Sequence, residues 1–167
     1  ETSKLLKIRG NAMQNSVPYG KGGMLALLNT TESSVAALCR NASQIGVCEV
    51  ANDNGAGQFV LSGEINAIEH AEKVCKDFDV KKAIKLNVSA PFHSSMMKPA
   101  ADAMQEALNP LQVSQLSVPV IANFTAAPNI DAGNVTQLLI NQVCGKVRWR
   151  ESIDFLYNNG VNRFVEV

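Results

Sequence analysis

The order of apolar runs and amphipathic segments between residues 23 and 88 is the feature that most constrains the fold. Apolar runs of strand length occur at 24–28, 47–51, 58–61 and 82–88. Amphipathic helices are predicted between them, over 32–42, where Thr31 can cap the helix, and over about 62–76. The predicted order is therefore β-α-β-β-α-β, which is that of the ferredoxin-like split βαβ unit.

Two local signals define the connections inside this unit. The Asn-Asp-Asn-Gly-Ala-Gly segment at 52–57 predicts the turn of a β-hairpin, because Asn and Gly tolerate positive φ. Ser62-Gly63 is expected to open the second helix, whose buried side would carry Ile65, Ile68 and Cys75.

The flanking segments have a different pattern. Helices are expected over 2–14, 99–108, 135–143 and 152–159, a short buried strand over 118–122, and a final strand over 163–167. Alternation of strands and helices favours an α/β sheet. No linker composition separates the parts, so residues 15–89 are predicted to form a small subdomain inserted into a larger one made of 1–14 and 90–167.

Composition excludes several classes of function. Fifteen basic and fifteen acidic residues give no net charge, which argues against non-specific binding to nucleic acid. No apolar run reaches the roughly 20 residues that cross a bilayer. The four cysteines form no Cys-x-x-Cys pair, so no metal is expected, and free thiols fit a reducing cytoplasm.

Only two histidines are available for acid–base chemistry. His70 lies in a predicted helix beside acidic residues, and a solvated position is expected for it. His93 lies in a loop between a strand and a helix, where α/β enzymes place reacting groups, although a role in capping the next helix is an equal alternative. No serine has the Gly-x-Ser-x-Gly frame of a nucleophile elbow, and Ser94 and Ser95 are better explained by helix capping.

Two other motifs have simple interpretations. The glycines at 20–23 precede a strand, whereas phosphate loops follow one, so a tight turn is predicted there. Five lysines form a basic cluster that Asp77 and Asp79 interrupt: Lys73, Lys76, Lys81, Lys82 and Lys85. They form either a solvated face or a docking surface for an acidic partner protein.

Several stretches together resemble one enzyme family. They are Arg9-Gly10-Asn11-Ala12-Met13-Gln14 with Val17-Pro18, Asn52-Asp53-Asn54 with Gly57-Gln58, the run from Ser89 to Ala101, and Val147-Arg148-Trp149. In that order they resemble the malonyl-CoA:acyl carrier protein transacylases of bacterial fatty acid synthesis. The Pro-x-His-x-x-x-Met-Lys-Pro-Ala segment at 91–100 is the most specific of them.

The resemblance implies an α/β-hydrolase-like large subdomain with an inserted ferredoxin-like small one. It also implies that His93 is the catalytic base and that the main-chain carbonyl of Gln142 orients it. Arg9 would bind the free carboxylate of malonyl, while Met13 and Asn54 would line the acyl cleft. The family's serine elbow, Gly-His-Ser-x-Gly, lies upstream of the arginine helix and is absent here, so this chain alone is not expected to turn over.

The resemblance further implies malonyl-CoA and acyl carrier protein as partners, no cofactor, a cytoplasmic location and a monomer. Two alternatives stay open. One is the acyltransferase module of a larger polyketide or fatty acid synthase, which shares these motifs. The other is a non-catalytic fragment that docks acyl carrier protein through its lysines.

Overall fold

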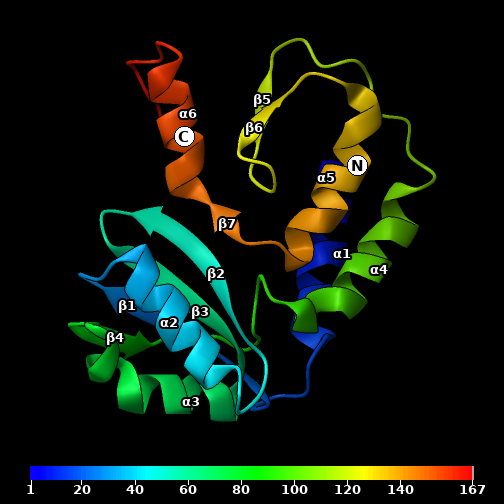
Figure 1. The fold of residues 1–167 in the computed structure, drawn as a ribbon. Coiled ribbons are helices and arrows are strands. Elements are labelled where there is room, and N and C mark those ends of the chain that lie inside the picture. Colours follow the sequence, from blue (N-terminus) through cyan, green and yellow to red (C-terminus); the bar gives the residue numbers. More distant parts are fainter. Residues whose placement is uncertain (167) are drawn as a thin grey trace.

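A computed structural model describes residues 1–166 (Figure 1). Its helices are α1 (Thr2–Asn15), α2 (Glu32–Ala42), α3 (Ile65–Val74), α4 (Lys98–Leu108), α5 (Ala132–Cys144) and α6 (Trp149–Asn158), with short 3-10 turns η1 (Cys75–Phe78) and η2 (Ser95–Met97). Its strands are β1 (Gly22–Leu28), β2 (Cys48–Gly55), β3 (Gln58–Glu64), β4 (Lys82–Lys85), β5 (Val120–Ala122), β6 (Ala127–Asn129) and β7 (Val147–Arg148). The α/β class predicted from the sequence is confirmed.

The main sheet contains five strands in the order β4-β1-β3-β2-β7. The first four pair antiparallel and come from the β-α-β-β-α-β segment, whose predicted element order is confirmed. The fifth strand, β7, was not predicted. It pairs parallel to β2, with Asn52 opposite Val147 and Asp53 opposite Arg148, and it joins the C-terminal part of the chain to this sheet (Figure 1).

Side-chain alternation along β1 divides the packing between the two faces of the sheet. Leu25 and Leu27 are fully buried in the core that α2 and α3 complete on one face. Met24 points to the opposite face, where Ala51 and Val60 form a smaller cluster that also contacts Phe92. The loop that contains His93 therefore packs on the sheet face that α2 and α3 leave open.

A second core lies among α1, α4 and α5, which pack together beside the sheet (Figure 1). Met13 of α1, Met97 and Met104 near and on α4, and Val143 of α5 are buried in this core. Pro99 occupies the first turn of α4, where its missing N–H costs no hydrogen bond. Phe92 also contacts this core, so the loop before His93 touches both hydrophobic clusters.

The predicted turn at 52–57 is wrong at its start, because residues 52–55 continue β2. The chain reverses instead at Ala56 and Gly57, whose φ angles are 49° and 71°. Local preference for a turn is overridden because Asp53 is completely buried and forms an ion pair with Arg150 of α6. The predicted hairpin itself is confirmed.

The predicted start of the second helix is also wrong. Ser62 and Gly63 belong to β3, where Gly63 pairs with Gly23, and α3 begins only at Ile65. Gly63 is required at this point because a Cβ atom there would lie 1.9 Å from the carbonyl oxygen of Val47. The last strand of the unit is shorter than predicted and ends at Lys85.

The structure differs from the sequence-based prediction at the two strands expected at 118–122 and 163–167. The strand predicted at 118–122 is not buried: Val118 is 63% exposed and Val120 is 49% exposed. Within the described chain, β5 pairs only with β6, so nothing covers its outer side. Residues 161–166 adopt no regular structure, against the predicted strand at 163–167, and Val167 lies outside the described residues.

Candidate active site

His93 lies in the loop between β4 and η2 and has a φ of 57°, in the left-handed region. A non-glycine residue in this region is uncommon and is maintained by its surroundings. Ser94 beside it is completely buried, and its Oγ donates a hydrogen bond to the carbonyl of Pro91 at 2.7 Å. This bond closes the loop, while Phe92 anchors it in two hydrophobic clusters.

The Nδ1 atom of His93 faces two main-chain carbonyls at the end of α5. It lies 3.2 Å from the carbonyl oxygen of Gln142 and 3.2 Å from that of Gly145. Carbonyls at the end of a helix lack partners within the helix and are free to accept such bonds. A ring that donates from Nδ1 leaves the lone pair of Nε2 available as a base, and within residues 1–166 no side chain hydrogen-bonds to Nε2.

The pKa of His93 is lowered from its ordinary value, chiefly because burial disfavours the charged ring. The positive charge of Arg9 lowers this pKa further, whereas the carbonyls of Gln142 and Gly145 act in the opposite direction. The imidazole is therefore neutral at neutral pH, which is the form that accepts a proton.

Arg9 lies on α1 and is half-buried. Among residues 1–166, no carboxylate forms an ion pair with it, whereas Arg148 and Arg150 in the C-terminal part of the chain are both paired. A half-buried guanidinium without a carboxylate is suited to bind an anionic ligand, because it can donate two parallel hydrogen bonds to a carboxylate.

The structure thus brings Arg9, His93 and the carbonyl of Gln142 into one region. Met13 follows Arg9 by four residues on α1, but its side chain is buried in the core with α4 and α5. Asn54 lies exposed on β2, at an irregularity in the pairing with β3. Nothing in the structure tests the expected contact of Met13 or Asn54 with an acyl group.

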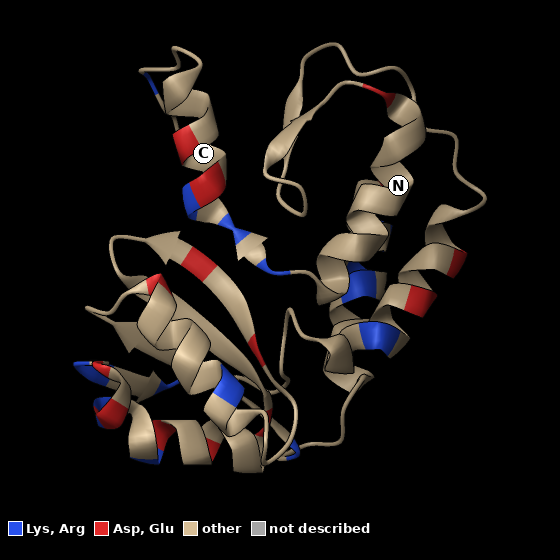
Figure 2. Cartoon of the chain, in the orientation of Figure 1, with Lys and Arg blue, Asp and Glu red and all other residues tan. Residues whose placement is uncertain are grey.

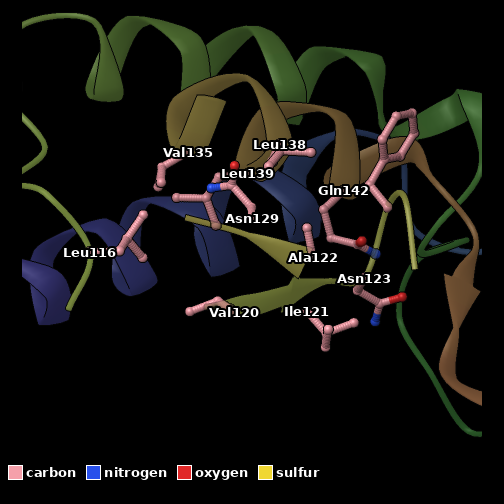
Figure 3. Close-up of a pocket in the computed structure, with 11 residues that line it drawn as sticks. Leu116, Val120, Ile121, Ala122, Asn123, Asn129, Val135, Leu138, Leu139 and Gln142 are labelled. Atoms are coloured by element: carbon pink, nitrogen blue, oxygen red, sulfur yellow. The ribbon is translucent and has the colours of Figure 1, made fainter. Parts of the chain in front are cut away.

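A mainly apolar cavity of about 300 Å3 lies beside Gln142 (Figure 3). Leu138 and Leu139 of α5 line one side, and Val120 and Ile121 of β5 line the other. The Nε2 of Gln142 approaches the carbonyl of Gly145 at 3.4 Å, while its buried Oε1 has no hydrogen-bond partner in the described chain.

Several side chains that hold the segments flanking the site were not found from the sequence. Glu49 of β2 contacts the main chain of Ser95 in the histidine loop, and Asp53 of β2 contacts Arg150 of α6. Asp53 and Arg150 are 97 residues apart, so no local spacing relates them. The second acceptor for His93, Gly145, was also missed, because a main-chain carbonyl carries no sequence signal of its own.

The remaining candidate residues lie away from this region. His70 is only half-exposed rather than solvated, because its Nε2 lies 2.8 Å from Oδ1 of Asn41 and joins α3 to α2. All four cysteines are free, as predicted. Contact with the Cys48 thiol lowers the pKa of Cys39, while burial acts in the opposite direction.

The predicted lysine cluster is not a continuous basic surface. Figure 2 shows basic and acidic segments interspersed around α3 and β4, and Lys85 forms an ion pair with Glu69 at 2.8 Å. No cluster of potential metal ligands occurs within residues 1–166, and no helix in that range is long and apolar enough to cross a membrane.

The known proteins that this chain resembles in sequence and in structure are acyltransferases. In particular, the chain is similar in sequence to malonyl CoA-acyl carrier protein transacylases. It is 35% identical to that of Salmonella typhimurium, over 98% of this chain and 53% of the relative. The chain spans about half the length of the curated relatives it matches. No protein-family model matches the sequence.

Solved structures agree with this relationship. The acyl-carrier-protein-S-malonyltransferase of Bartonella henselae is 47% identical, with a TM-score of 0.92, over 96% of this chain and 51% of that one. A type II polyketide synthase malonyl-transacylase, solved in complex with its acyl carrier protein, is 33% identical with a TM-score of 0.90, over 95% and 51% of the two chains.

Proposed function

We propose that this chain supplies the histidine and arginine of a malonyl-CoA:acyl carrier protein transacylase. The observation that carries the proposal is the pairing of His93 Nδ1 with two main-chain carbonyls, beside an arginine that has no carboxylate partner within residues 1–166. The homology to transacylases over 98% of the chain supports it.

In the proposed reaction, a serine hydroxyl attacks the thioester carbonyl of malonyl-CoA, and Nε2 of His93 accepts the serine proton. The bond to sulfur then breaks, and His93 returns the proton to the departing coenzyme A thiolate. The pantetheine thiol of acyl carrier protein next attacks the malonyl ester, gives its proton to His93, and takes the malonyl group. The serine recovers its proton from His93.

The nucleophilic serine of this scheme is supplied by polypeptide outside the 167 residues. Ser94 cannot serve, because it is completely buried and its hydroxyl is committed to the carbonyl of Pro91. Two neutral carbonyls in place of a carboxylate hold the histidine tautomer while stabilising the imidazolium less strongly. A histidine with a lowered pKa is consistent with that arrangement.

Arg9 is proposed to bind the free carboxylate of malonyl and so to select malonyl over acetyl. An acetyl group would leave the guanidinium unpaired in a partly buried site, which is unfavourable. Met13 and Asn54 are proposed to line the acyl cleft next to it. Met13 is placed at the cleft because it lies one helical turn after Arg9 on α1.

We also propose the finer division of the fold. Residues 15–89 form a ferredoxin-like subdomain, supported by the strand order β4-β1-β3-β2 with antiparallel neighbours. Residues 1–14 and 90–167 form part of an α/β-hydrolase-like subdomain. The exposed edge of β5 and the uncovered apolar residues near it are consistent with a part of a larger sheet.

Malonyl-CoA and acyl carrier protein are the proposed partners, with no cofactor, and a cytoplasmic monomer is the proposed state. The solved complex of a related malonyl-transacylase with an acyl carrier protein favours the carrier protein as a partner. A module of a larger synthase uses the same chemistry and remains the second candidate. The interspersed charges around α3 and β4 give no specific support to a non-catalytic docking fragment.

A chimera tests the proposal. Residues 1–167 replace the matching segment of the Bartonella henselae relative, which shares 47% identity with them, and malonyl transfer to holo acyl carrier protein is measured. We expect transfer, with a loss of about 10²–10⁴-fold on His93→Ala, the usual contribution of acid–base catalysis. A folded chimera that transfers no malonyl, or one in which His93→Ala is fully active, would contradict the proposal.

A further inference from the structure

We propose that strand β2 sets His93 against its carbonyl acceptors, with Asp53 and Glu49 as positioning residues. The two side chains lie on one strand and bind the segments on either side of the hydrogen bonds made by His93. This inference builds on the proposed function, because it assigns a purpose to the tautomer that His93 would use as a base.

Asp53 binds the segment that carries the acceptor carbonyls. Its side chain is 1% exposed, and its Oδ2 accepts hydrogen bonds from Nε and Nη2 of Arg150, at 2.9 and 2.6 Å. Its Oδ1 accepts from the main-chain N–H of Gly55 at 3.2 Å. A buried carboxylate with both oxygens occupied has one preferred geometry, so it holds Arg150 and the start of α6 in a fixed position.

The main chain transmits this position to Gly145. Asn52 and Asp53 pair with Val147 and Arg148 in the parallel ladder between β2 and β7. Gly145 lies only two residues before Val147, and its carbonyl is one of the two acceptors for His93. The location of that carbonyl is therefore set by β2 through a ladder and an ion pair on adjacent residues.

Glu49 binds the other segment, which carries the histidine. Its Oε2 accepts a hydrogen bond from the main-chain N–H of Ser95 at 2.7 Å, two residues after His93. Glu49 and Asp53 are four residues apart on β2 and lie opposite Ser62 and Phe59 of β3. One strand thus determines the separation between the histidine loop and the end of α5.

The backbone conformation of His93 depends on the segments that surround it. With a φ of 57°, the residue is in a conformation that its neighbours must maintain. If either segment moves away, the Nδ1–H loses its acceptors, and the ring is free to adopt the tautomer with the proton on Nε2. That tautomer has no lone pair on Nε2 and could not act as the proposed base.

Nitrogen-15 NMR of the two histidine rings at pH 8 tests the inference without an activity assay. In the unaltered chain we expect the proton of His93 on Nδ1. Two variants test the ion pair between Asp53 and Arg150. The double variant Asp53→Asn with Arg150→Gln removes both charges and leaves no unpaired buried ion. Arg150→Lys keeps the positive charge but cannot make the two hydrogen bonds of the guanidinium. Each should shift the His93 tautomer towards Nε2–H.

Two further variants test the hydrogen bond between Glu49 and the main chain of Ser95. Glu49→Ala should produce the same shift, and Glu49→Gln, which keeps an acceptor oxygen, should restore the original tautomer. Lys85→Gln, which breaks the exposed pair with Glu69, is the matched control and should change nothing. His70, bound to Asn41, serves as an internal reference in every spectrum.

An unchanged His93 tautomer in folded Arg150→Lys and Glu49→Ala chains would overturn the inference. The same holds if Glu49→Gln and Glu49→Ala behave alike. These outcomes are independent of the proposed function, because they are read from ring nitrogens in the 167-residue chain. Failure of the chimera to transfer malonyl would refute the function and leave the tautomer result intact.

Discussion

Nδ1 of His93 lies 3.2 Å from the main-chain oxygen of Gln142, so the histidine is oriented by backbone rather than by a carboxylate side chain. The carbonyl of Gly145 accepts at the same distance. A substitution of the Gln142 side chain that preserves the helix leaves this backbone acceptor in place. The proposed site therefore differs in its sensitivity to mutation from a Ser-His-Asp triad, in which one side chain holds the base.

Gln142→Ala should keep most of the malonyl transfer of the chimera, within about tenfold of the unaltered enzyme. The side chain of Gln142 makes only one long hydrogen bond, at 3.4 Å, and its buried Oε1 has no partner in residues 1–166, so its removal takes little from the site. Initial rates with holo acyl carrier protein measure the effect. A loss as large as that of His93→Ala would assign the side chain itself an essential role.

Arg9→Ala in the chimera should reduce malonyl transfer by roughly 100-fold and acetyl transfer far less. Hydrogen bonds to charged groups contribute about 1.5–3 kcal/mol, and acetyl has no carboxylate to receive them. The kcat/KM values for malonyl-CoA and acetyl-CoA give the comparison. Arg40→Ala, at an exposed arginine on α2, is the matched control. Equal losses for the two substrates would exclude Arg9 as the carboxylate ligand.

The acylation rate should rise with pH through a pKa below 6.5 and then stay constant, because burial and Arg9 both lower the pKa of His93. In Arg9→Ala this midpoint should move upwards, since a positive neighbour is removed. The NMR titration of His93 in the 167-residue chain provides the same two values. A midpoint above 6.5, or one that falls in Arg9→Ala, would disagree with the observed environment.

Because folding lowers the pKa of His93, the free energy of unfolding of the chain should depend on pH. The unfolded chain binds a proton on this histidine more readily than the folded one, so stability increases with pH in this range. The contribution of His93 is fully present above the unfolded value near 6.5 and is lost as pH falls through the lower folded value. Chemical unfolding of the unaltered chain and of His93→Ala at pH 5 and pH 8 measures this dependence. The free energy of unfolding should fall more from pH 8 to pH 5 in the unaltered chain than in His93→Ala, and an equal fall would contradict the lowered pKa.

Much of the fold was predictable because its signals are local. Helix α2 was predicted at its observed boundaries, since Thr31 caps it and Val35 and Leu38 repeat on one face. The order of β1 to β4 followed from similar patterns. Errors occurred where tertiary contacts override local preference: Asp53 holds a turn-like sequence in β2, and pairing with β1 keeps Gly63 in β3.

The candidate site was predictable only in part. His93 stood out because it is one of two histidines and lies in a loop after a strand, and the roles of Arg9 and Gln142 came from the resemblance to a family. Glu49, Asp53 and Arg150 were missed because their partners are distant in sequence. The parallel strand β7 is two residues long, which is too short for a periodic pattern.

Gly63→Ala should destabilise the chain by about 3 kcal/mol or more, because its Cβ would lie 1.9 Å from the backbone oxygen of Val47 and the strands would have to separate. Gly10→Ala is the matched control. No atom lies within 4 Å of the corresponding Cβ on α1, and alanine there should stabilise the helix by about 0.5–1 kcal/mol. Urea unfolding measures both. Similar effects for the two variants would contradict the close strand approach.

The most direct test of the central claim is the rate at which the chimera acquires a covalent malonyl group. Malonyl-CoA is mixed with enzyme, the reaction is stopped with acid at short times, and intact mass is measured. We expect a single malonyl adduct that forms quickly in the unaltered chimera and about 10²–10⁴-fold more slowly in His93→Ala. Equally fast adduct formation in both proteins would show that His93 is not the base.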